Sequence, residues 1–336
     1  MEIAFFGLKD WKEIISSRIY KELELKEINV RFFDDKIEEY LEEIKDVEMI
    51  ACFIYTKITK EIIAKLSKLK FIATLSTGFD HIDLKECKKR GILISNVPIY
   101  GSNTVAEHTF ALLLTLSRNI QKAYSRAIEG NFSIDSLMGF DLYGKTIGIV
   151  GTGNIGINVA RIAKGFGMNI VAYDLFKKEN LSKEIGFEYI EYLELLEKSD
   201  VITFHLPYNE KTHHILNSQN IKKLKKGAII INTARGALID TKALLSEIKS
   251  GRIEGCGLDV LEGEIDIKDD VAVLSENYPL KKMKTVILNN MLLKNHNIVV
   301  TPHIAFYSKE AIARIIDTTL KNIKSFVRNS PMNLVQ

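Results

Sequence analysis

The stretch Lys145–Gly156, which reads KTIGIVGTGNIG, decides how the chain is interpreted. Its apolar first half is typical of a strand that is buried on both faces of a parallel sheet. The spacing Gly151-x-Gly153-x-x-Gly156 allows a sharp turn into a helix and a close approach of the backbone to a pyrophosphate. An amphipathic stretch at 158–166 supplies the helix, whose N-terminal N–H groups would face the phosphates. The stretch therefore predicts a dinucleotide-binding β-α unit.

A second strand, 169–173, follows this helix and ends at Asp174, about 20 residues beyond the glycines. A carboxylate there accepts hydrogen bonds from the adenosine ribose hydroxyls and repels a 2′-phosphate. Asp174 therefore predicts NAD, rather than NADP, as the cofactor. The alternative is that Asp174 only ends the strand. Lys177 and Lys178 lie close by and could hold a phosphate, so the residues alone do not exclude NADP.

Length and charge bound the class of protein. A chain of 336 residues is long enough for two domains of ordinary size. Lys and Arg total 46 against 43 Asp and Glu, and the charges are spread along the chain. Because no basic block stands out, we expect neither a nucleic-acid nor a membrane partner. The start lacks a signal-peptide pattern and no apolar run is long enough for a bilayer, so we expect a soluble, cytoplasmic protein.

The cysteines do not form a pattern that binds metals. Cys52, Cys87 and Cys256 contain no C-x-x-C pair, and two of them lie in apolar, strand-like stretches. This favours buried reduced thiols over disulfides or metal ligands. We therefore expect no metal site.

Short apolar runs alternate with charged helical stretches along the chain, which predicts an α/β fold with parallel sheets. In the first 100 residues we expect strands at 3–7, 30–33, 49–55, 71–76 and 92–97, and helices at 12–24, 37–44, 59–69 and 83–90. Beyond the glycine loop we expect helices at 192–198, 241–250, 283–293 and 309–327, and strands that end near 206, 232, 260 and 301. The last helix is expected to return to the first domain.

Two further segments stand out in this alternation. An Ala- and Leu-rich helix at 104–118, capped by Ser102 or Asn103, is expected to cross between the domains. Its apolar content exceeds one stripe, so we expect burial on more than one side and a subunit contact. The segment 262–297 breaks the alternation, with an acidic, loop-like first half and a helical second half.

Three stretches that follow predicted strands of the second domain carry polar side chains: 232–236, 258–264 and 301–305. Parallel α/β sheets bind ligands at this carboxyl edge. The stretches supply Arg235, an acid and His303. A guanidinium can hold a carboxylate through two parallel hydrogen bonds, and a histidine can exchange a proton with a carbonyl oxygen. An acid bonded to the other imidazole nitrogen orients the ring and favours its charged form, so this set suits proton-coupled hydride transfer to a 2-oxo acid.

Each of these residues also has a structural interpretation. Arg235 could be a surface cation, and a histidine after a proline is more often structural than catalytic. Glu264 has the acidic neighbours Glu262 and Asp266, so the residues alone leave open which acid pairs with His303. The histidines that lack such a setting are interpreted as structural or exposed: His81, His108, His213, His214 and His296.

Four motifs in order make the chain resemble the D-isomer-specific 2-hydroxyacid dehydrogenase family: LSTGFDHID at 75–83, VGTGNIG at 150–156, NTARG at 232–236 and TPHIAFY at 301–307. The likeness is greatest to its D-lactate and D-hydroxyisocaproate dehydrogenase branch, through YGSN at 100–103, LDVLEGE at 258–264 and HIAFY at 303–307. The resemblance implies an NAD-dependent oxidoreductase that interconverts a 2-oxo acid and a D-2-hydroxy acid. We also expect a homodimer.

The resemblance implies an α/β protein with two doubly wound parallel-sheet domains. A flavodoxin-like substrate-binding domain would comprise residues 1–100 and 304–336, and a Rossmann NAD-binding domain would be inserted at 101–303. Catalytic roles fall to Arg235 on the substrate carboxylate and carbonyl, His303 as acid and base, and Glu264 as the partner of His303. The implied cofactor-binding residues are Gly151, Gly153, Asn154, Ile155, Gly156, Asp174, His205, Pro207, Thr233, Ala234, Arg235 and Asp259, the last near the nicotinamide carboxamide. The implied substrate-binding residues are Thr77, Gly78, Tyr100, Arg235 and His303.

Two other functions stay open at this point. NAD-sensing corepressors resemble this family, act through protein partners and can retain Arg235, Glu264 and His303, although we find no extended partner-binding tail. A phosphoglycerate- or hydroxypyruvate-type dehydrogenase is the alternative among enzymes. Against it, the turn at 75–80 has no Arg or Lys for a second anion and no regulatory domain is recognised.

Overall fold

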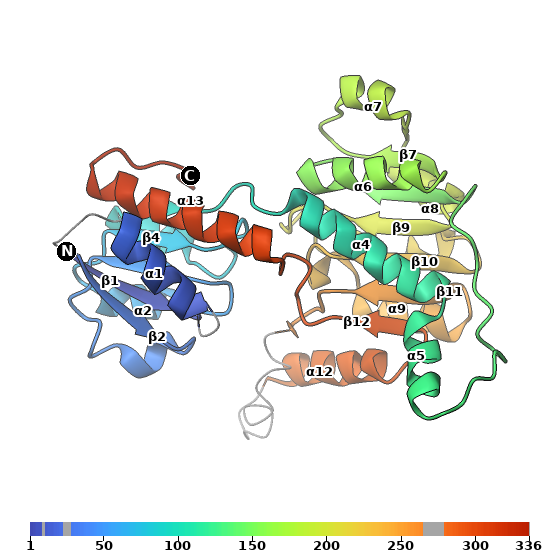
Figure 1. The fold of residues 1–336 in the computed structure, drawn as a ribbon, viewed down its shortest axis with the longest axis horizontal. Coiled ribbons are helices and arrows are strands. Elements are labelled where there is room, and N and C mark those ends of the chain that lie inside the picture. The colour runs from blue at the N-terminus through green and yellow to red at the C-terminus, as the bar shows by residue number, and fades with distance from the viewer. Residues whose placement is uncertain (9–10, 23–27, 265–278, 336) are drawn as a thin grey trace. The chain divides into compact units, whose positions relative to one another are not determined.

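The computed structural model describes residues 1–8, 11–22, 28–264 and 279–335 (Figure 1). The chain divides into two compact units, Met1–Gly101 with Ser308–Gln336, and Ser102–Tyr307. Each unit contains one parallel sheet, so the predicted α/β fold class is confirmed.

The first unit is built on a five-stranded parallel sheet with the order β2-β1-β3-β4-β5. Its strands are β1 (Glu2–Phe6), β2 (Asn29–Phe33), β3 (Met49–Cys52), β4 (Phe71–Thr74) and β5 (Leu93–Ser95). Its helices are α1 (Lys12–Glu22), the 3-10 helix η2 (Ile37–Tyr40), α2 (Lys60–Lys65), α3 (Leu84–Arg90) and α13 (Lys309–Val327). The strand order reverses between β1 and β3, as in flavodoxin-like domains.

Three predicted helices of the first unit differ from the observed ones, and one of them, expected at 59–69, already ends at Lys65. The helix expected at 37–44 is only the short helix η2, and Lys36 before it offers no side-chain cap. The helix expected at 12–24 is observed as Lys12–Glu22, and residues 23–27 lie outside the described part of the chain. By contrast, α2 and α3 begin as expected, because Thr59 and Asp83 accept a backbone hydrogen bond from the first turn.

Helix α13 returns to the five-stranded sheet, as the sequence predicts. Phe326 stacks on Phe71 of β4 with ring centroids 4.4 Å apart. Asp317 forms an ion pair with Arg18 of α1. Beyond the helix, Leu334 forms an antiparallel bridge with Ser95 of β5. The first unit is therefore completed by residues from the far end of the sequence.

The second unit is built on a seven-stranded parallel sheet with the order β12-β11-β10-β9-β6-β7-β8. Its strands are β6 (Thr146–Val150), β7 (Asn169–Tyr173), β8 (Glu188–Tyr189), β9 (Val201–Phe204), β10 (Ala228–Asn232), β11 (Ile253–Leu258) and β12 (Ile298–Val300). Its helices are α4 (Ser102–Ser117), α5 (Ile120–Ile128), α6 (Asn154–Gly165), α7 (Glu179–Ile185), α8 (Tyr192–Lys198), η3 (Ile221–Lys223), η4 (Gly236–Leu238), α9 (Thr241–Lys249) and α12 (Leu280–Leu293). Successive strands run outward from β6 in both directions, which is the Rossmann arrangement with its switch point beside β6.

Helices cover both faces of this sheet (Figure 1). Helices α4 and α6 pack on the face to which Ile229 and Ile231 of β10 point. Helices α8 and α9 pack on the other face, with Ile230. Because successive side chains of a strand point to opposite faces, a strand covered on both sides is buried throughout, as β10 is, and β10 is apolar up to Ile231.

Helices α4 and α5 depart from the predictions in part. Ser102 and Asn103 lie inside the first turn of α4, so the predicted caps are wrong. Burial over a broad face is observed, since the exposed positions Asn103, Glu107 and Ala111 form one narrow row. Helix α5 has no counterpart among the predicted elements, and none of its residues is buried.

Only part of the segment 262–297 lies within the described residues. Helix α12 corresponds to the helix predicted at 283–293. Residues 265–278, and with them Asp266, lie outside the described part of the chain.

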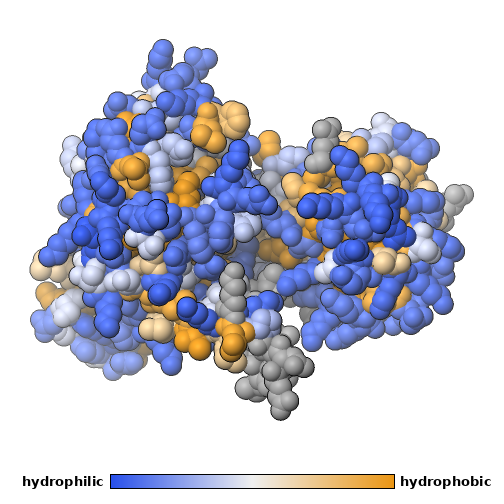
Figure 2. Space-filling model, turned by 180° about the vertical axis from the view of Figure 1, so that it is seen from behind, coloured by the Kyte–Doolittle hydropathy of each residue, from blue (hydrophilic) through white to orange (hydrophobic). Residues whose placement is uncertain are grey.

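Among the described residues, no helix combines the length and the apolar character needed to cross a bilayer. One face of the molecule is largely hydrophilic, with separate hydrophobic patches (Figure 2).

Candidate active site

The glycine loop joins β6 to α6. A side chain at each of its three glycines would have a different effect. Gly151 has a φ of +100°, and a Cβ there would lie 2.8 Å from the backbone of His205. A Cβ on Gly156 would lie 2.0 Å from the carbonyl oxygen of Gly151, so this glycine lets the helix approach the strand. A Cβ on Gly153 would meet no protein atom within 4 Å. The protein itself does not need a glycine at 153, whereas a closely approaching pyrophosphate does.

The start of α6 is also suited to a phosphate group. Gly153 is the N-cap residue and forms no side-chain cap. The first turn, from Asn154 through Ile155 to Gly156, therefore presents backbone N–H groups and the positive end of the helix dipole. These two features fit a dinucleotide bound through its pyrophosphate.

Asp174 follows β7 and its carboxylate faces the glycine loop. Its Oδ2 atom accepts hydrogen bonds from the backbone N–H of Thr152 at 2.6 Å and from the Thr152 hydroxyl at 3.1 Å. Its Oδ1 atom accepts from the N–H of Phe176 at 2.9 Å. The acid is therefore fixed beside the loop that would hold the pyrophosphate.

His205 and Pro207 follow β9 next to the same loop. The N–H of His205 donates to the carbonyl of Val150 at 2.8 Å, and its Nε2 lies 2.9 Å from the hydroxyl of Thr203. Burial lowers the pKa of His205 to about 3, so the ring is neutral near pH 7. Its Nδ1 atom is buried without a hydrogen-bond partner among the described residues. A bound cofactor would supply a partner for this atom.

The stretches that carry the predicted catalytic residues follow β10, β11 and β12, which are neighbours in the sheet. Asn232 connects the first two, because its carbonyl accepts from the N–H of Asp259 at 2.9 Å. Its side-chain amide bonds the N–H of Ala234 at 3.0 Å and the carbonyl of Arg235 at 2.9 Å. Thr233 is buried and its hydroxyl lies 3.1 Å from that of Thr109 in α4. The 232–236 loop therefore has a fixed shape.

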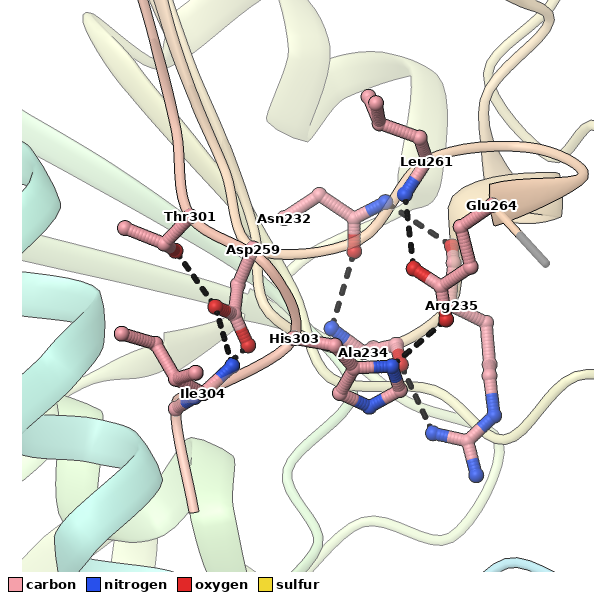
Figure 3. Close-up of polar contacts among 10 residues, drawn as sticks. Asn232, Ala234, Arg235, Asp259, Leu261, Glu264, Thr301, His303 and Ile304 are labelled. Carbon is pink, nitrogen blue, oxygen red and sulfur yellow. Dashed lines mark hydrogen bonds and ion pairs between the residues drawn. The ribbon is translucent and has the colours of Figure 1, made fainter. Parts of the chain in front are cut away.

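Arg235 is half-buried on this loop, and its guanidinium donates to the carbonyl of Ala234 at 2.8 Å (Figure 3). The next residue, Gly236, packs directly on the segment after β11, since a Cβ there would lie 2.0 Å from the backbone of Leu261. Any side chain at 236 would push the two segments apart. This contact ties the loop of Arg235 to the segment that carries Glu264.

His303 and Glu264 form a close pair (Figure 3). The Nδ1 atom of His303 lies 2.6 Å from Oε1 of Glu264, and Oε2 accepts from the N–H of Leu261 at 3.2 Å. Because a carboxylate only accepts, the proton of the neutral ring is assigned to Nδ1. The Nε2 atom, on the ring edge that points away from Glu264, is the nitrogen left for proton exchange.

The backbone of His303 has a φ of +56°, which is uncommon for a residue with a side chain. Asp259 holds it there, because the carbonyl of Asp259 accepts from the N–H of His303 at 2.9 Å. The buried carboxylate of Asp259 accepts from three groups of the same loop: the hydroxyl of Thr301 and the N–H groups of Ile304 (2.9 Å) and Ala305 (2.8 Å). The resemblance implies that Asp259 contacts the nicotinamide carboxamide, whereas its visible effect is to hold the loop of His303.

Glu262, the other acid considered for His303, is paired elsewhere. Its Oε1 atom lies 2.9 Å from Nε2 of His214, and its Oε2 accepts from the hydroxyl of Thr241 at 3.0 Å. Of the two acids, Glu264 is therefore the one that contacts His303.

Several residues that support the site are not recognisable from their type. Asn232 and Thr301 lie within the NTARG and TPHIAFY motifs, so their position was the available signal. The Nε2 atom of His108 lies 3.1 Å from the hydroxyl of Thr301, and that of His214 lies 2.9 Å from Glu262, so both histidines contact groups next to the site. Their distance along the sequence gives no local signal of this.

Thr77, Gly78 and Tyr100 lie in the first unit, in loops that follow β4 and β5. The carbonyl of Thr77 accepts from the side chain of Asn96 at 2.8 Å, and that of Gly78 accepts from the hydroxyl of Ser76 at 2.5 Å. The turn at 76–78 is therefore rigid. Because its carbonyls are used within the protein, its N–H groups are the backbone atoms that suit an anion.

The described residues contain no group of three or more His, Cys, Asp or Glu side chains suited to a metal ion. The cysteines are free and buried. Burial raises the pKa of Cys52 to about 12 and that of Cys87 to about 11, so these thiols stay protonated.

A Rossmann sheet with a dinucleotide loop, and a histidine–acid pair with an arginine at the carboxyl edge of the same sheet, define a class of dinucleotide-dependent oxidoreductases. The family model described as "D-isomer specific 2-hydroxyacid dehydrogenase, NAD binding domain" matches residues 110–305. A "2-hydroxyacid dehydrogenase homolog" of Haemophilus influenzae is 39% identical over 333 residues, 96% of this chain and 95% of the relative. The chain therefore belongs to the D-isomer-specific 2-hydroxyacid dehydrogenase family, and it is an NAD-binding enzyme that acts on CH–OH groups.

Other similar proteins have names that refer to different substrates. A "glyoxylate reductase" of Korarchaeum cryptofilum is 37% identical over 300 residues, 88% of this chain and 84% of the relative. The structure of a D-lactate dehydrogenase from Aquifex aeolicus "complexed with NAD and lactic acid" has a TM-score of 0.85 and 38% identity, over 98% of this chain and 96% of the other. A D-2-hydroxyisocaproate dehydrogenase structure has a TM-score of 0.82 and 29% identity, over 100% of this chain and 99% of the other.

Proposed function

We propose that this enzyme reduces a small 2-oxo acid to the D-2-hydroxy acid with NADH, and that pyruvate and D-lactate are its preferred pair. The observation that carries the proposal is the 2.6 Å contact between His303 and Glu264 beside the loop of Arg235. The similar A. aeolicus enzyme, solved with lactic acid, supports lactate, while the glyoxylate reductase among the relatives makes glyoxylate the second candidate.

The three side chains would divide the work on the substrate. NADH, when bound, supplies the hydride for the carbonyl carbon. Arg235 would hold the substrate carboxylate and polarise the carbonyl through parallel N–H donors. Protonated His303 would give the proton on Nε2 to the carbonyl oxygen, and Glu264 would stabilise the charged ring and fix its orientation. In the oxidation direction the neutral ring takes the proton back.

The second unit would also provide the cofactor contacts. The pyrophosphate would bind at the 151–156 loop, where the N–H groups of α6 begin, and Asp174 would accept from the adenosine ribose. We assign the rest of the cofactor to the strand ends that carry His205, Pro207, Thr233 and Ala234. From the first unit, we propose that the N–H groups at Thr77 and Gly78 and the hydroxyl of Tyr100 contact the substrate.

We infer that the protein works as a homodimer through α5 and the segment that follows it. Ile120, Tyr124 and Ile128 recur every four residues along one face of α5 and are 53%, 66% and 68% exposed. The next segment adds Phe132, Ile134 and Met138, which are 82%, 82% and 91% exposed. So many exposed large apolar side chains within 19 residues are uncommon on a monomer and typical of a homodimer interface.

We also infer a cytoplasmic location. Free cysteines, all of them buried, are the form expected in a reducing compartment.

A panel of 2-oxo acids with NADH tests the function. Pyruvate, glyoxylate, 2-oxoisocaproate, hydroxypyruvate and 3-phosphohydroxypyruvate would be compared by kcat/KM, with chiral analysis of the product. We expect the highest value for pyruvate and a D-configured product. A preference for 3-phosphohydroxypyruvate or hydroxypyruvate would point to the phosphoglycerate- or hydroxypyruvate-type alternative. NADH binding without turnover of any acid would point to a corepressor-like binding protein.

A further inference from the structure

Tyr189, at the end of β8, contacts two segments next to Asp174, the glycine loop and the loop after β7. Its hydroxyl lies 2.8 Å from the hydroxyl of Thr152 in the glycine loop. The same hydroxyl accepts from the backbone N–H of Lys178 at 3.0 Å. Thr152 in turn contacts Asp174. One tyrosine therefore connects the loop after β7, the glycine loop and the acid.

The chemistry of the two ends fixes the direction of each hydrogen bond in this network. The N–H of Lys178 can only donate, and the carboxylate of Asp174 can only accept. The single hydroxyl proton of Thr152 goes to Asp174, so the proton of Tyr189 goes to Thr152. Thr152 is fully buried, which shields the middle of the network from water.

The network leaves Asp174 with one preferred direction for a further donor. Its carboxylate has about four acceptor positions, and Thr152 and Phe176 occupy three of them. The position that remains is on Oδ1. The orientation of the Asp174 carboxylate is therefore fixed, because it cannot rotate without breaking a bond to the glycine loop.

Tyr189 also contacts both lysines that could bind a phosphate, Lys177 through its ammonium and Lys178 through its backbone. The ammonium of Lys177 lies over the ring, 5.9 Å from its centroid. The backbone of Lys178 is bonded to the hydroxyl. The ring itself is fixed by edge-to-face packing against buried Phe187, with centroids 5.2 Å apart.

We propose that Tyr189 is a positioning residue that sets the choice between NAD and NADP. The inference rests on the proposed function of Asp174 as the ribose acceptor. Through Thr152, Tyr189 orients Asp174 toward the ribose, and through its ring it keeps the ammonium of Lys177 from the place where a cation would bind a 2′-phosphate.

Two variants separate the contacts of the Tyr189 hydroxyl from the contact of its ring. Tyr189→Phe loses the bonds to Thr152 and Lys178 but keeps a ring under Lys177, whereas Tyr189→Leu loses the ring as well. Dissociation constants for NADH and NADPH would be measured by nicotinamide fluorescence, and kcat/KM with one 2-oxo acid. We expect the preference for NADH over NADPH to fall by about fivefold in Tyr189→Phe, the effect of losing the bond to Thr152 that orients Asp174, and further in Tyr189→Leu.

Tyr192→Phe is the matched control, because it also removes a tyrosine hydroxyl from the second unit. That hydroxyl donates to the carbonyl of Ile215 at 3.0 Å, away from the Asp174 network. The cofactor preference of this variant should equal that of the wild type. Adding Lys177→Gln to Tyr189→Leu should remove the gain in NADPH binding that the freed lysine provides.

The outcomes separate this inference from the function on which it rests. If Asp174→Ala relaxes the preference while both Tyr189 variants keep it, Tyr189 has no positioning role and Asp174 retains its function. If Asp174→Ala also keeps the wild-type preference, the assignment of Asp174 itself is wrong. Should Tyr189→Leu not fold, Tyr189→Phe and Thr152→Val test the hydroxyl network without removing the ring.

Discussion

His303 and Glu264 lie 2.6 Å apart, whereas Glu262, only two residues earlier, lies 2.9 Å from His214. Each acid therefore has its own histidine. The two pairs provide matched variants that separate an effect on proton transfer from a general effect of removing a charge.

Glu264→Gln keeps a hydrogen-bonding group next to His303 but removes the negative charge. The ring then loses the carboxylate that fixes its orientation and stabilises it while it carries the proton, so kcat/KM for the 2-oxo acid should fall. The measurement is steady-state kinetics with NADH and the 2-oxo acid. Glu262→Gln should leave kcat/KM near the wild-type value, and a fall in that variant alone would assign the partner role to Glu262.

Arg235→Lys keeps the charge but loses the planar fork that grips a carboxylate. We expect kcat/KM to fall by an amount that corresponds to about 2 to 4 kcal/mol of transition-state stabilisation. Steady-state kinetics check this, with Arg161→Lys on the exposed side of α6 as the control. Kinetics near those of the wild type in Arg235→Lys would place the anion site elsewhere.

Gly156→Ala should lower the stability of the protein, whereas Gly153→Ala should weaken NADH binding and leave the stability nearly unchanged. A methyl group at 156 would lie 2.0 Å from a carbonyl oxygen, so Gly156→Ala should lower the free energy of unfolding by about 1 to 3 kcal/mol. A methyl group at 153 faces open space, so Gly153→Ala should change it by less than about 0.5 kcal/mol and yet weaken NADH binding. Urea unfolding and NADH titration measure the two effects. Tight NADH binding by Gly153→Ala would argue against a pyrophosphate at this loop.

His205 makes the stability depend on pH. Its pKa is about 3 in the folded protein, against 6.5 for an unperturbed histidine. Between these values unfolding takes up a proton, so the free energy of unfolding should fall as the pH falls, by up to about 1.4 kcal/mol per pH unit. Urea unfolding of the wild type and of His205→Gln at pH 7, 6 and 5 isolates this part. Parallel pH dependences would show that His205 is not buried in its neutral form.

The apolar face of α5 should control assembly. Tyr124→Lys with Ile128→Glu places charges on that face, and because no α5 residue is buried within the chain, the fold should be kept. Sedimentation velocity should show a dimer for the wild type and a monomer for the double variant. Gln121→Glu with Ser125→Lys, which changes neighbouring polar positions, is the control. A monomeric wild type would disprove the assembly.

The sequence predicts most of the fold because strands covered on both faces are apolar along most of their length, as β10 is up to Ile231. It fails where the local signal is weak. The stretch at 37–44 has no N-cap acceptor and forms only a short 3-10 helix. Helix α5 is not predicted although Ile120, Tyr124 and Ile128 have helical spacing, because its apolar face is exposed and does not join the core of the described residues.

The positions of Arg235 and His303 are also predictable, because both follow strands that pair with β11. The choice between Glu262 and Glu264 is not, since both acids lie on one turn. It is decided by backbone geometry, in which Glu264 accepts from the N–H of Leu261. The Tyr189 network is likewise invisible in the sequence, because its members come together only when β7 and β8 pair.

The split of the first unit has a consequence for the order in which the protein folds during its synthesis. Residues 102–307 are complete before α13 has been made, whereas the five-stranded unit lacks α13 until then. Since Phe71 of β4 stacks on Phe326, the early part of the chain exposes an apolar surface while the ribosome is still translating the rest. The unit in the middle of the sequence is therefore expected to fold first, and the unit that begins the sequence last.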